Sequence, residues 1–248
     1  MAQLFHTVEY KLQHILHMKK FTEMKKILVM VVVLLAGLST QSFAQVSQVR
    51  VGLKAGYSVT GWQGEAVQSF KDLIEYTNGN VETRMRQGFH AGAYLSIPLG
   101  AGFEFEPGVQ YAQKGMVLEG RMPGENVQVL NAKVTITNKA EYIDVPLLAK
   151  VYIGEGFNLF AGPQVSFLVS NKVNVSAGAL GFSAYNSDFN WNTPQRTVDV
   201  GFSAGAGYQL QNGLNVSGSY DMGLTTIDDN ADYKSYNQGF KASVGYRF

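Results

Sequence analysis

Few side chains in this sequence could support nucleophilic, acid–base or metal chemistry. Beyond the first 44 residues His90 is the single histidine, and the chain has no cysteine. A histidine activates a serine when an acid orients the ring, but no motif around His90 indicates such a triad, and a lone histidine on a polar strand face more often hydrogen-bonds within that face. The counts also exclude a histidine or thiolate metal cluster. We therefore expect no catalytic residue and no metal-binding residue.

Two other patterns could hold a ligand. Asp228, Asp229 and Asp232 could form a weak Ca²⁺ site, because calcium prefers carboxylate oxygens, although a solvated acidic loop accounts for them equally well. The glycines of Gly205-Ala206-Gly207 form no phosphate loop, since no helix pattern follows them. We expect no cofactor. With a net charge of +1 and no basic patch, nucleic acid is not an expected partner.

A larger set of charged residues recurs at every second position along the chain. Five are acidic and five are basic, so they could pair within the interior of a closed sheet or line a narrow ion pathway. Eight strands leave room only for side chains, whereas water-filled porins need about sixteen, so we favour a filled interior. This lumen charge network comprises Arg50, Lys54, Glu104, Glu106, Asp144, Lys150, Asp199, Asp221, Lys241 and Arg247.

Such period-two alternation is typical of strands with two different faces. It recurs in eight segments: 49–59, 88–99, 102–115, 141–153, 156–170, 198–210, 213–224 and 240–248. Tight turns near 100, 155 and 212 alternate with four long polar connections, 60–87, 116–140, 171–197 and 225–237. Outer-membrane barrels have this arrangement, with short turns at one end and long loops at the other. Pro107, Pro146 and Pro163 fall inside predicted strands and should cause local bulges or gaps in the ladder.

The face opposite the charges is apolar, as in Ile143, Val145, Leu147, Ala149 and Val151. In water it would form an apolar patch far larger than soluble monomers show, whereas a bilayer requires it. The faces are therefore inverted relative to a soluble ligand-binding barrel. The sequence predicts an all-β fold, an eight-stranded antiparallel up-and-down transmembrane β-barrel.

The N-terminus has the features of an export signal. Residues 24–26 are basic at two of three positions, 27–38 are apolar, and Ser42 and Ala44 supply the small residues before a cleavage site. Twelve apolar residues in a helix span only about 18 Å, too short for a bilayer core of about 30 Å. We expect residues 1–23 to be an upstream extension (with Met24 the true start), 24–44 a signal peptide cleaved between Ala44 and Gln45, and 45–248 the barrel domain.

Seven tracts of the chain resemble the PorT-like outer-membrane β-barrel proteins, a family of small "porin family" barrels. They are 51–56 (VGLKAG), 89–93 (FHAGA), 106–115 (EPGVQYAQKG), 142–148 (YIDVPLL), 161–164 (AGPQ), 205–208 (GAGY) and 244–248 (VGYRF). The tracts around Pro146 and Pro163 are the most specific. The resemblance covers nearly the whole predicted barrel and implies an outer-membrane location, but it implies little about activity. It also implies that the strand prolines are regular features of the barrel.

The last strand carries apolar residues at alternate positions up to its end, which resembles the signal read by the barrel-assembly machinery; these residues are Phe240, Val244, Tyr246 and Phe248. Expected partners are thus outer-membrane lipid, that machinery, and an unknown surface ligand or envelope protein. The leading hypothesis is a non-enzymatic membrane scaffold or surface interaction protein that acts through its four long outer loops. Its candidate contact residues are Trp62, Tyr76, Phe182, Tyr185, Phe189, Trp191, Tyr233 and Tyr236. The alternatives are a narrow channel for small solutes, a periplasmic ligand-binding barrel and a membrane enzyme.

Overall fold

The computed structural model describes residues 48–65, 81–121, 133–179, 182–190, 196–227 and 234–248, all within the compact unit Val46–Phe248. These residues form antiparallel strands: β1 Arg50–Gly64, β2 Val81–Gly100, β3 Phe103–Lys114, β4 Met116–Arg121, β5 Lys133–Ile153, β6 Phe157–Ala179, β7 Phe182–Asn190, β8 Val198–Gln209, β9 Leu214–Gly223 and β10 Ser235–Arg247. No helix in the described part of the chain is long and apolar enough to cross a membrane.

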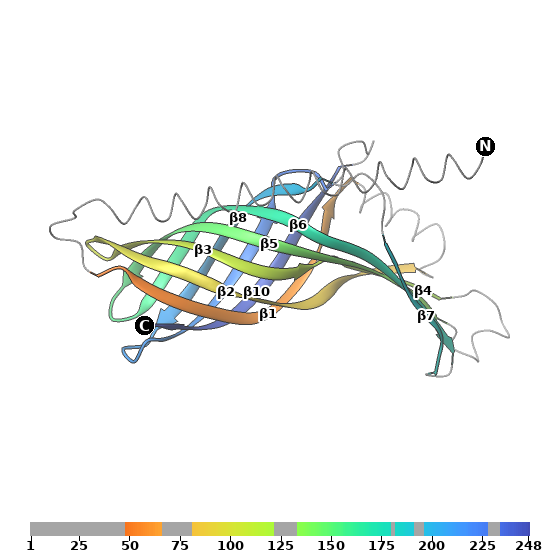
Figure 1. The fold of residues 1–248 in the computed structure, drawn as a ribbon, viewed down its shortest axis with the longest axis horizontal. Coiled ribbons are helices and arrows are strands. Elements are labelled where there is room, and N and C mark those ends of the chain that lie inside the picture. Colours follow the sequence, from red (N-terminus) through yellow and green to blue (C-terminus); the bar gives the residue numbers. More distant parts are fainter. Residues whose placement is uncertain (1–47, 66–80, 122–132, 180–181, 191–195, 228–233) are drawn as a thin grey trace, which may run out of the picture. The chain divides into compact units, whose positions relative to one another are not determined.

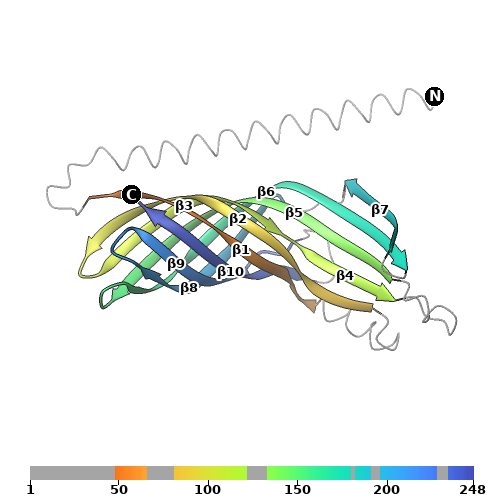
Figure 2. The ribbon, with the colours of Figure 1, turned by 90° about the horizontal axis from the view of Figure 1, so that it is seen from below.

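The strands close into a ring. Each pairs with its neighbour in the order β1, β2, β3, β5, β6, β8, β9, β10, and β10 returns to β1 through pairs such as Tyr57↔Ala242. β4 continues β3 beyond Gly115 and pairs with the same two neighbours, β2 and β5, so β3 and β4 occupy one place in the ring. β7 lies outside the ring and pairs with the far part of β6. The ring therefore has eight members, which confirms the predicted fold class. Figures 1 and 2 show the strands wrapped around a common axis.

The three short turns lie at the end of the barrel that holds the C-terminus (Figure 1). They join β2 to β3, β5 to β6 and β8 to β9. In the last of them Gly213 adopts a φ of +94°, and its amide donates to the carbonyl of Leu210 at 3.2 Å. Only glycine adopts this backbone conformation without strain. The Asn212-Gly213 hairpin predicted from the sequence is therefore present, and short turns occupy one end of the barrel as expected.

The prediction that the long connections consist of loop was wrong for much of their length. β2 begins at Val81, β4 and β5 fill much of 116–140, and β6 with β7 fills much of 171–197. In these segments the apolar residues switch to the inner face, and the outer face carries polar residues such as Thr135 and Asn174. The alternation expected of a lipid-facing strand therefore does not continue into them.

The strand prolines lie beside gaps in the ladder. Between β3 and β5 the register passes from Pro107↔Leu147 to Gln110↔Asp144, and between β5 and β6 it passes from Pro146↔Gln164 to Ala149↔Ala161. A proline has no amide hydrogen to donate. The described neighbouring strands therefore lack backbone pairing at these points. Such gaps in the ladder are one of the two outcomes, bulges or gaps, that we expected of the prolines.

The two faces of the ring differ in the predicted sense. Inward residues are polar and buried, including Glu106 and Asp144, which are 2% and 0% exposed. Outward residues are apolar and exposed, including Leu53, Phe103 and Val244. The buried interior of this protein is therefore polar, and its apolar surface is the exterior.

Candidate functional site

Glu106 is the centre of one ion-pair cluster in the lumen. The Lys54 ammonium donates to a Glu106 oxygen at 2.9 Å, and Lys150 pairs with the other oxygen. The ring of Tyr94 lies beside both lysines, with 5.1 Å between the Lys54 Nζ and the ring centroid. Asn215 donates to the Tyr94 hydroxyl at 2.8 Å from the opposite side of the barrel. This cluster joins β1, β2, β3, β5 and β9 across the lumen.

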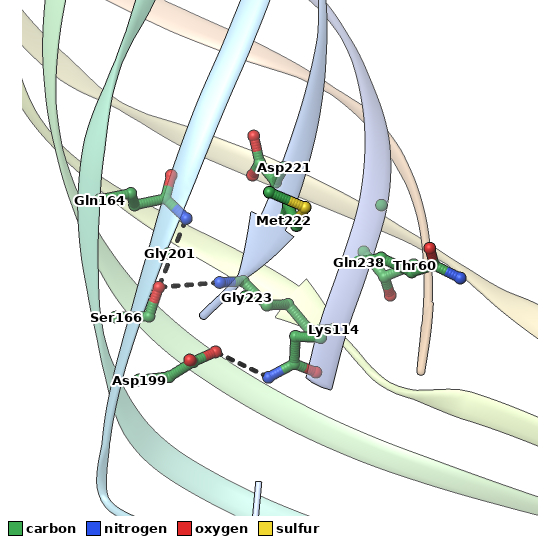
Figure 3. Close-up of a pocket in the computed structure, with 12 residues that line it drawn as sticks. Thr60, Lys114, Gln164, Ser166, Asp199, Gly201, Asp221, Met222, Gly223 and Gln238 are labelled. Atoms are coloured by element: carbon green, nitrogen blue, oxygen red, sulfur yellow. Dashed lines mark hydrogen bonds between the residues drawn. The ribbon is translucent and has the colours of Figure 1, made fainter. Parts of the chain in front are cut away.

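Asp144 is the centre of a second cluster, nearer the end away from the short turns. Lys114 lies 2.7 Å from one of its oxygens and Lys241 lies 3.1 Å from the other. Lys241 also reaches Asp221 at 2.6 Å, and Asp221 accepts a hydrogen bond from Ser203 at 2.7 Å. Figure 3 shows this region, where Lys114 and Gln164 both donate to the Ser166 hydroxyl. Every charge in this cluster has an opposite charge in contact with it.

The remaining residues predicted for the network lie in different surroundings. Arg247 donates to Glu104 at 3.1 Å and lies beside the Tyr152 hydroxyl. Asp199 has no lysine or arginine partner among the described residues and accepts hydrogen bonds from Thr225 and Asn237 instead. Arg50 is exposed at the short-turn end, where it lines an open hollow of about 450 Å³ with Arg247. The structure thus brings eight of the ten residues into direct ion pairs and leaves Asp199 and Arg50 outside them.

Lys114 is a lumen residue that the sequence analysis missed. It is 5% exposed and supplies one of the two cations that meet Asp144. Its position continues the even-numbered alternation that begins at Glu104 and Glu106, so following that pattern to the end of the segment would have identified it. Arg86 donates to the carbonyl oxygens of Lys114 and Ala140. It precedes the predicted start of its strand at residue 88, so the alternation of that strand could not identify it.

His90 is buried in the lumen at 1% exposure, and its Nε2 lies 2.8 Å from the Ser243 hydroxyl. A catalytic triad needs an acid on the other ring nitrogen to orient the imidazole. Among the described residues, Nδ1 of His90 has no hydrogen-bond partner. Nor do any three His, Cys, Asp or Glu side chains of the described part of the chain form a group that could hold a metal ion. The contact with Ser243 fixes His90 within the polar interior.

The lumen contains little free space between the Asp144 cluster and the opening of the barrel opposite to the short turns. The cavity shown in Figure 3 measures about 20 Å³ and is lined by Lys114, Asp199 and Asp221 among other residues. That volume holds about one water molecule. Side chains therefore fill this part of the lumen and leave no room there for a solute.

The far end of the barrel carries a sheet that extends beyond the ring. We call it the outer extension and define it as 81–85 of β2, all of β4, 133–140 of β5, 171–179 of β6, and β7. It lies at the end opposite to the C-terminus (Figures 1 and 2). Of the predicted contact residues, Tyr185 and Phe189 are exposed on β7, Phe182 begins β7, and Trp62 and Tyr236 are partly buried on β1 and β10.

The residues of the predicted assembly signal all lie on the exposed outer face of β10 or at its end. Phe240 packs against Tyr220 at 4.9 Å between ring centroids, and Tyr246 packs against Phe248 at 5.1 Å. The predicted cleavage site at Ala44 and Gln45, the acidic group Asp228, Asp229 and Asp232, and the contact candidates Tyr76, Trp191 and Tyr233 lie outside the described residues.

A known protein family agrees with this architecture. The family described as outer membrane protein beta-barrel domain matches residues 41–229. No curated protein matches the chain significantly. Among solved structures, the chain is similar to Ail, the attachment invasion locus protein of Yersinia pestis, with a TM-score of 0.42 and 12% identity over 82% of this chain and 100% of that chain. It is also similar to Neisserial surface protein A, with a TM-score of 0.38 and 12% identity over 82% of this chain and 99% of that chain.

Proposed function

This chain belongs to the family of outer membrane proteins with a β-barrel domain, whose place is the bacterial outer membrane, and we propose that it acts there as a non-enzymatic surface interaction protein. The barrel is the membrane scaffold, and the outer extension is the part that contacts ligands or partners. The observation that supports this proposal is the filled lumen. Its buried carboxylates pair with lysines of other strands, and Lys241 reaches Asp144 from the opposite wall, which leaves the outer extension as the surface available for recognition.

A narrow channel is the competing function, and electrical recording separates the two. We expect the purified, folded protein to give no conductance steps in a planar lipid bilayer. Removal of the Glu106 cluster in a Lys54→Ala, Glu106→Ala, Lys150→Ala variant should open the lumen and produce small steps, which shows that the assay would detect a channel. Steps from the wild-type protein would contradict the proposal.

Cells test the interaction role directly. Cells that display the protein should adhere to at least one of a panel of immobilised proteins and polysaccharides, and cells without it should not. The triple variant Ile136→Ser, Tyr185→Ser, Phe189→Ser should lose the adhesion, because it removes exposed apolar side chains of the outer extension. It changes no residue of the ring. A His90→Ala variant should keep it. If His90→Ala abolishes the adhesion and the triple variant leaves it intact, the site of action is the lumen and the proposal fails.

Three narrower assignments belong to the same proposal. We propose that the chain is a PorT-like barrel, on the strength of the tracts 106–115, 142–148 and 161–164. We also propose that a signal peptide is cleaved before Gln45, which N-terminal sequencing of the membrane-inserted protein tests. Finally, the barrel-assembly machinery is the proposed insertion partner, and loss of insertion in a variant lacking Phe248 would support it.

A further inference from the structure

The polarity of the two strand faces inverts where β5 leaves the ring. Alternate residues of a strand lie on opposite sides of the sheet. Within the ring the outward residues of β5 are apolar, as in Ile143 and Leu147, whereas in the outer extension they are Thr135, Thr137 and Lys139. Because water is the solvent of a polar outer face and lipid that of an apolar one, the inversion marks the border of the membrane.

On the inner side of the outer extension apolar residues lie next to one another across neighbouring strands, with Ser187 and Asn138 among them. The register places Leu118 beside Ile136, Ile136 beside Val175, Val173 beside Phe189, and Ala177 beside Tyr185. Ile136 is 37% exposed, Tyr185 49% and Phe189 48%. This inner apolar face, defined by Leu118, Ile136, Val173, Val175, Tyr185 and Phe189, lies on the side of the sheet opposite to the lipid-facing surface of the ring. Lipid contact therefore does not account for it.

The outward side of the same sheet is polar and paired. Asn174 donates to Asn186 at 2.7 Å and to Asp188 at 2.8 Å, and Lys139 donates to Asp188 at 3.1 Å. Arg84 pairs with Glu82 and Glu119 on β2 and β4. The outer extension is thus an amphipathic sheet in water. Its polar side chains on the outward side bond to one another, and its apolar inner side is partly exposed.

β7 also provides an open edge. It pairs with β6 from Lys172↔Asn190 to Ala179↔Phe182, and no other described strand pairs with it. The second edge of such a strand presents backbone N–H and C=O groups that pair readily with another extended chain. The edge and the inner apolar face meet at Tyr185 and Phe189, because both residues belong to β7.

We propose that this edge and the inner apolar face together form a docking site for an extended segment of a partner protein, which adds to β7 as a further strand. Main-chain hydrogen bonds give such a complex its affinity, and alternate side chains give it specificity. The segment should carry apolar residues at alternate positions, to lie beside Tyr185 and Phe189. Its other residues should be polar, with a lysine or arginine favoured next to Asp188, since opposite charges on neighbouring strands stabilise the pair. This inference rests on the proposed function and specifies its ligand class.

The test uses peptides and the full folded protein in lipid nanodiscs. A library of random dodecapeptides displayed on phage is selected against the protein, and the recovered peptides are synthesised and titrated by fluorescence anisotropy. We expect enriched sequences with alternating apolar residues. Each peptide is then compared with two analogues. One is N-methylated at the alternate amides that face β7, and the other at the alternate amides that face away from it. N-methylation of the set that faces β7 should abolish binding, because it removes the main-chain donors and keeps every side chain, whereas the other analogue should still bind.

Matched variants locate the site. Tyr185→Ser and Phe189→Ser should each weaken peptide binding by about tenfold, as truncation of central aromatic residues does at other interfaces. Ser176→Ala, on the polar side of the same sheet, should leave binding unchanged. Recovery of no peptide, equal binding of both N-methylated analogues, or equal binding by Phe189→Ser would overturn the inference. So would formation of a β7-linked dimer in the nanodiscs, which would assign the site to a second copy. Adhesion of cells that persists when the peptide tests fail would leave the proposed function standing.

Discussion

The ammonium of Lys241 lies 3.1 Å from a carboxylate oxygen of Asp144, although the two residues are 97 positions apart in the chain. They belong to β10 and β5, on different walls of the ring. Lys114 lies 2.7 Å from the other oxygen of the same carboxylate, which is fully buried. One side chain of β5 therefore holds two cations from β3 and β10, and it connects three strands through the lumen.

Asp144→Asn should destabilise the protein by about 3–5 kcal/mol, because it leaves the buried ammonium groups of Lys114 and Lys241 short of a counter-charge. Urea unfolding in detergent micelles, followed by tryptophan fluorescence, measures the change. Asp188→Asn serves as the control, since Asp188 is an exposed acid in a surface ion pair, and it should unfold at the wild-type urea concentration. Equal midpoints for wild type and Asp144→Asn would show that the central ion pairs do not stabilise the barrel.

Gly52→Ala should also be destabilising, by about 1–3 kcal/mol, as overpacking of a filled interior is in other proteins. A Cβ atom at Gly52 would overlap with the Tyr94 ring, which the hydrogen bond from Asn215 holds in place. Gly218→Ala is the matched control, because its Cβ would meet nothing closer than 4.0 Å. Gly52→Ala combined with Tyr94→Ala should cost less than the sum of the two single changes. Strict additivity would mean that the predicted clash is absent.

Arginine substitutions on β5 should locate the membrane border. Leu147→Arg should cost about 2–4 kcal/mol, because lipid-facing arginine near the middle of the bilayer is that unfavourable in outer-membrane barrels. Thr137→Arg lies on the same side of the same strand but in the outer extension, where arginine is in water, and should fold normally. Folding into phospholipid vesicles at increasing urea gives both values. Similar costs at the two positions would contradict the polarity inversion.

The β6–β7 hairpin should loosen in acid. Hydrogen bonds from Asn174 and Lys139 hold the pKa of Asp188 below its usual value of 3.8. A depressed folded pKa means that the stabilisation is complete above the usual value and is lost as the pH falls through the folded one. Hydrogen exchange of residues 185–189 should therefore quicken at pH values below the usual pKa, corrected for intrinsic rates. Asp188→Asn should remove this pH dependence, and an unchanged dependence in that variant would assign it to another group.

The sequence by itself determined the strands of the ring and the side to which each residue belongs. Period-two alternation has only one geometric meaning, so the pattern alone places Lys54 and Glu106 inside the ring and Leu53 and Leu147 outside it. Asn212-Gly213 specified a tight turn because of its local backbone preferences. The eight-stranded class followed, since closure is the way in which a sheet satisfies its edges in lipid.

Only the tertiary structure decided which charges meet and where the strands end. The contact of Asp144 with both Lys114 and Lys241 depends on strand tilt and on the register around the whole ring, and neither is encoded in the spacing of any one segment. The outer extension was missed because the apolar residues move from the outer to the inner face of the strands at the membrane border. At that border water replaces lipid on the outer face. β7 was missed for a related reason: it has no lipid-facing side, and on its inner side Ser187 interrupts the apolar residues Tyr185 and Phe189.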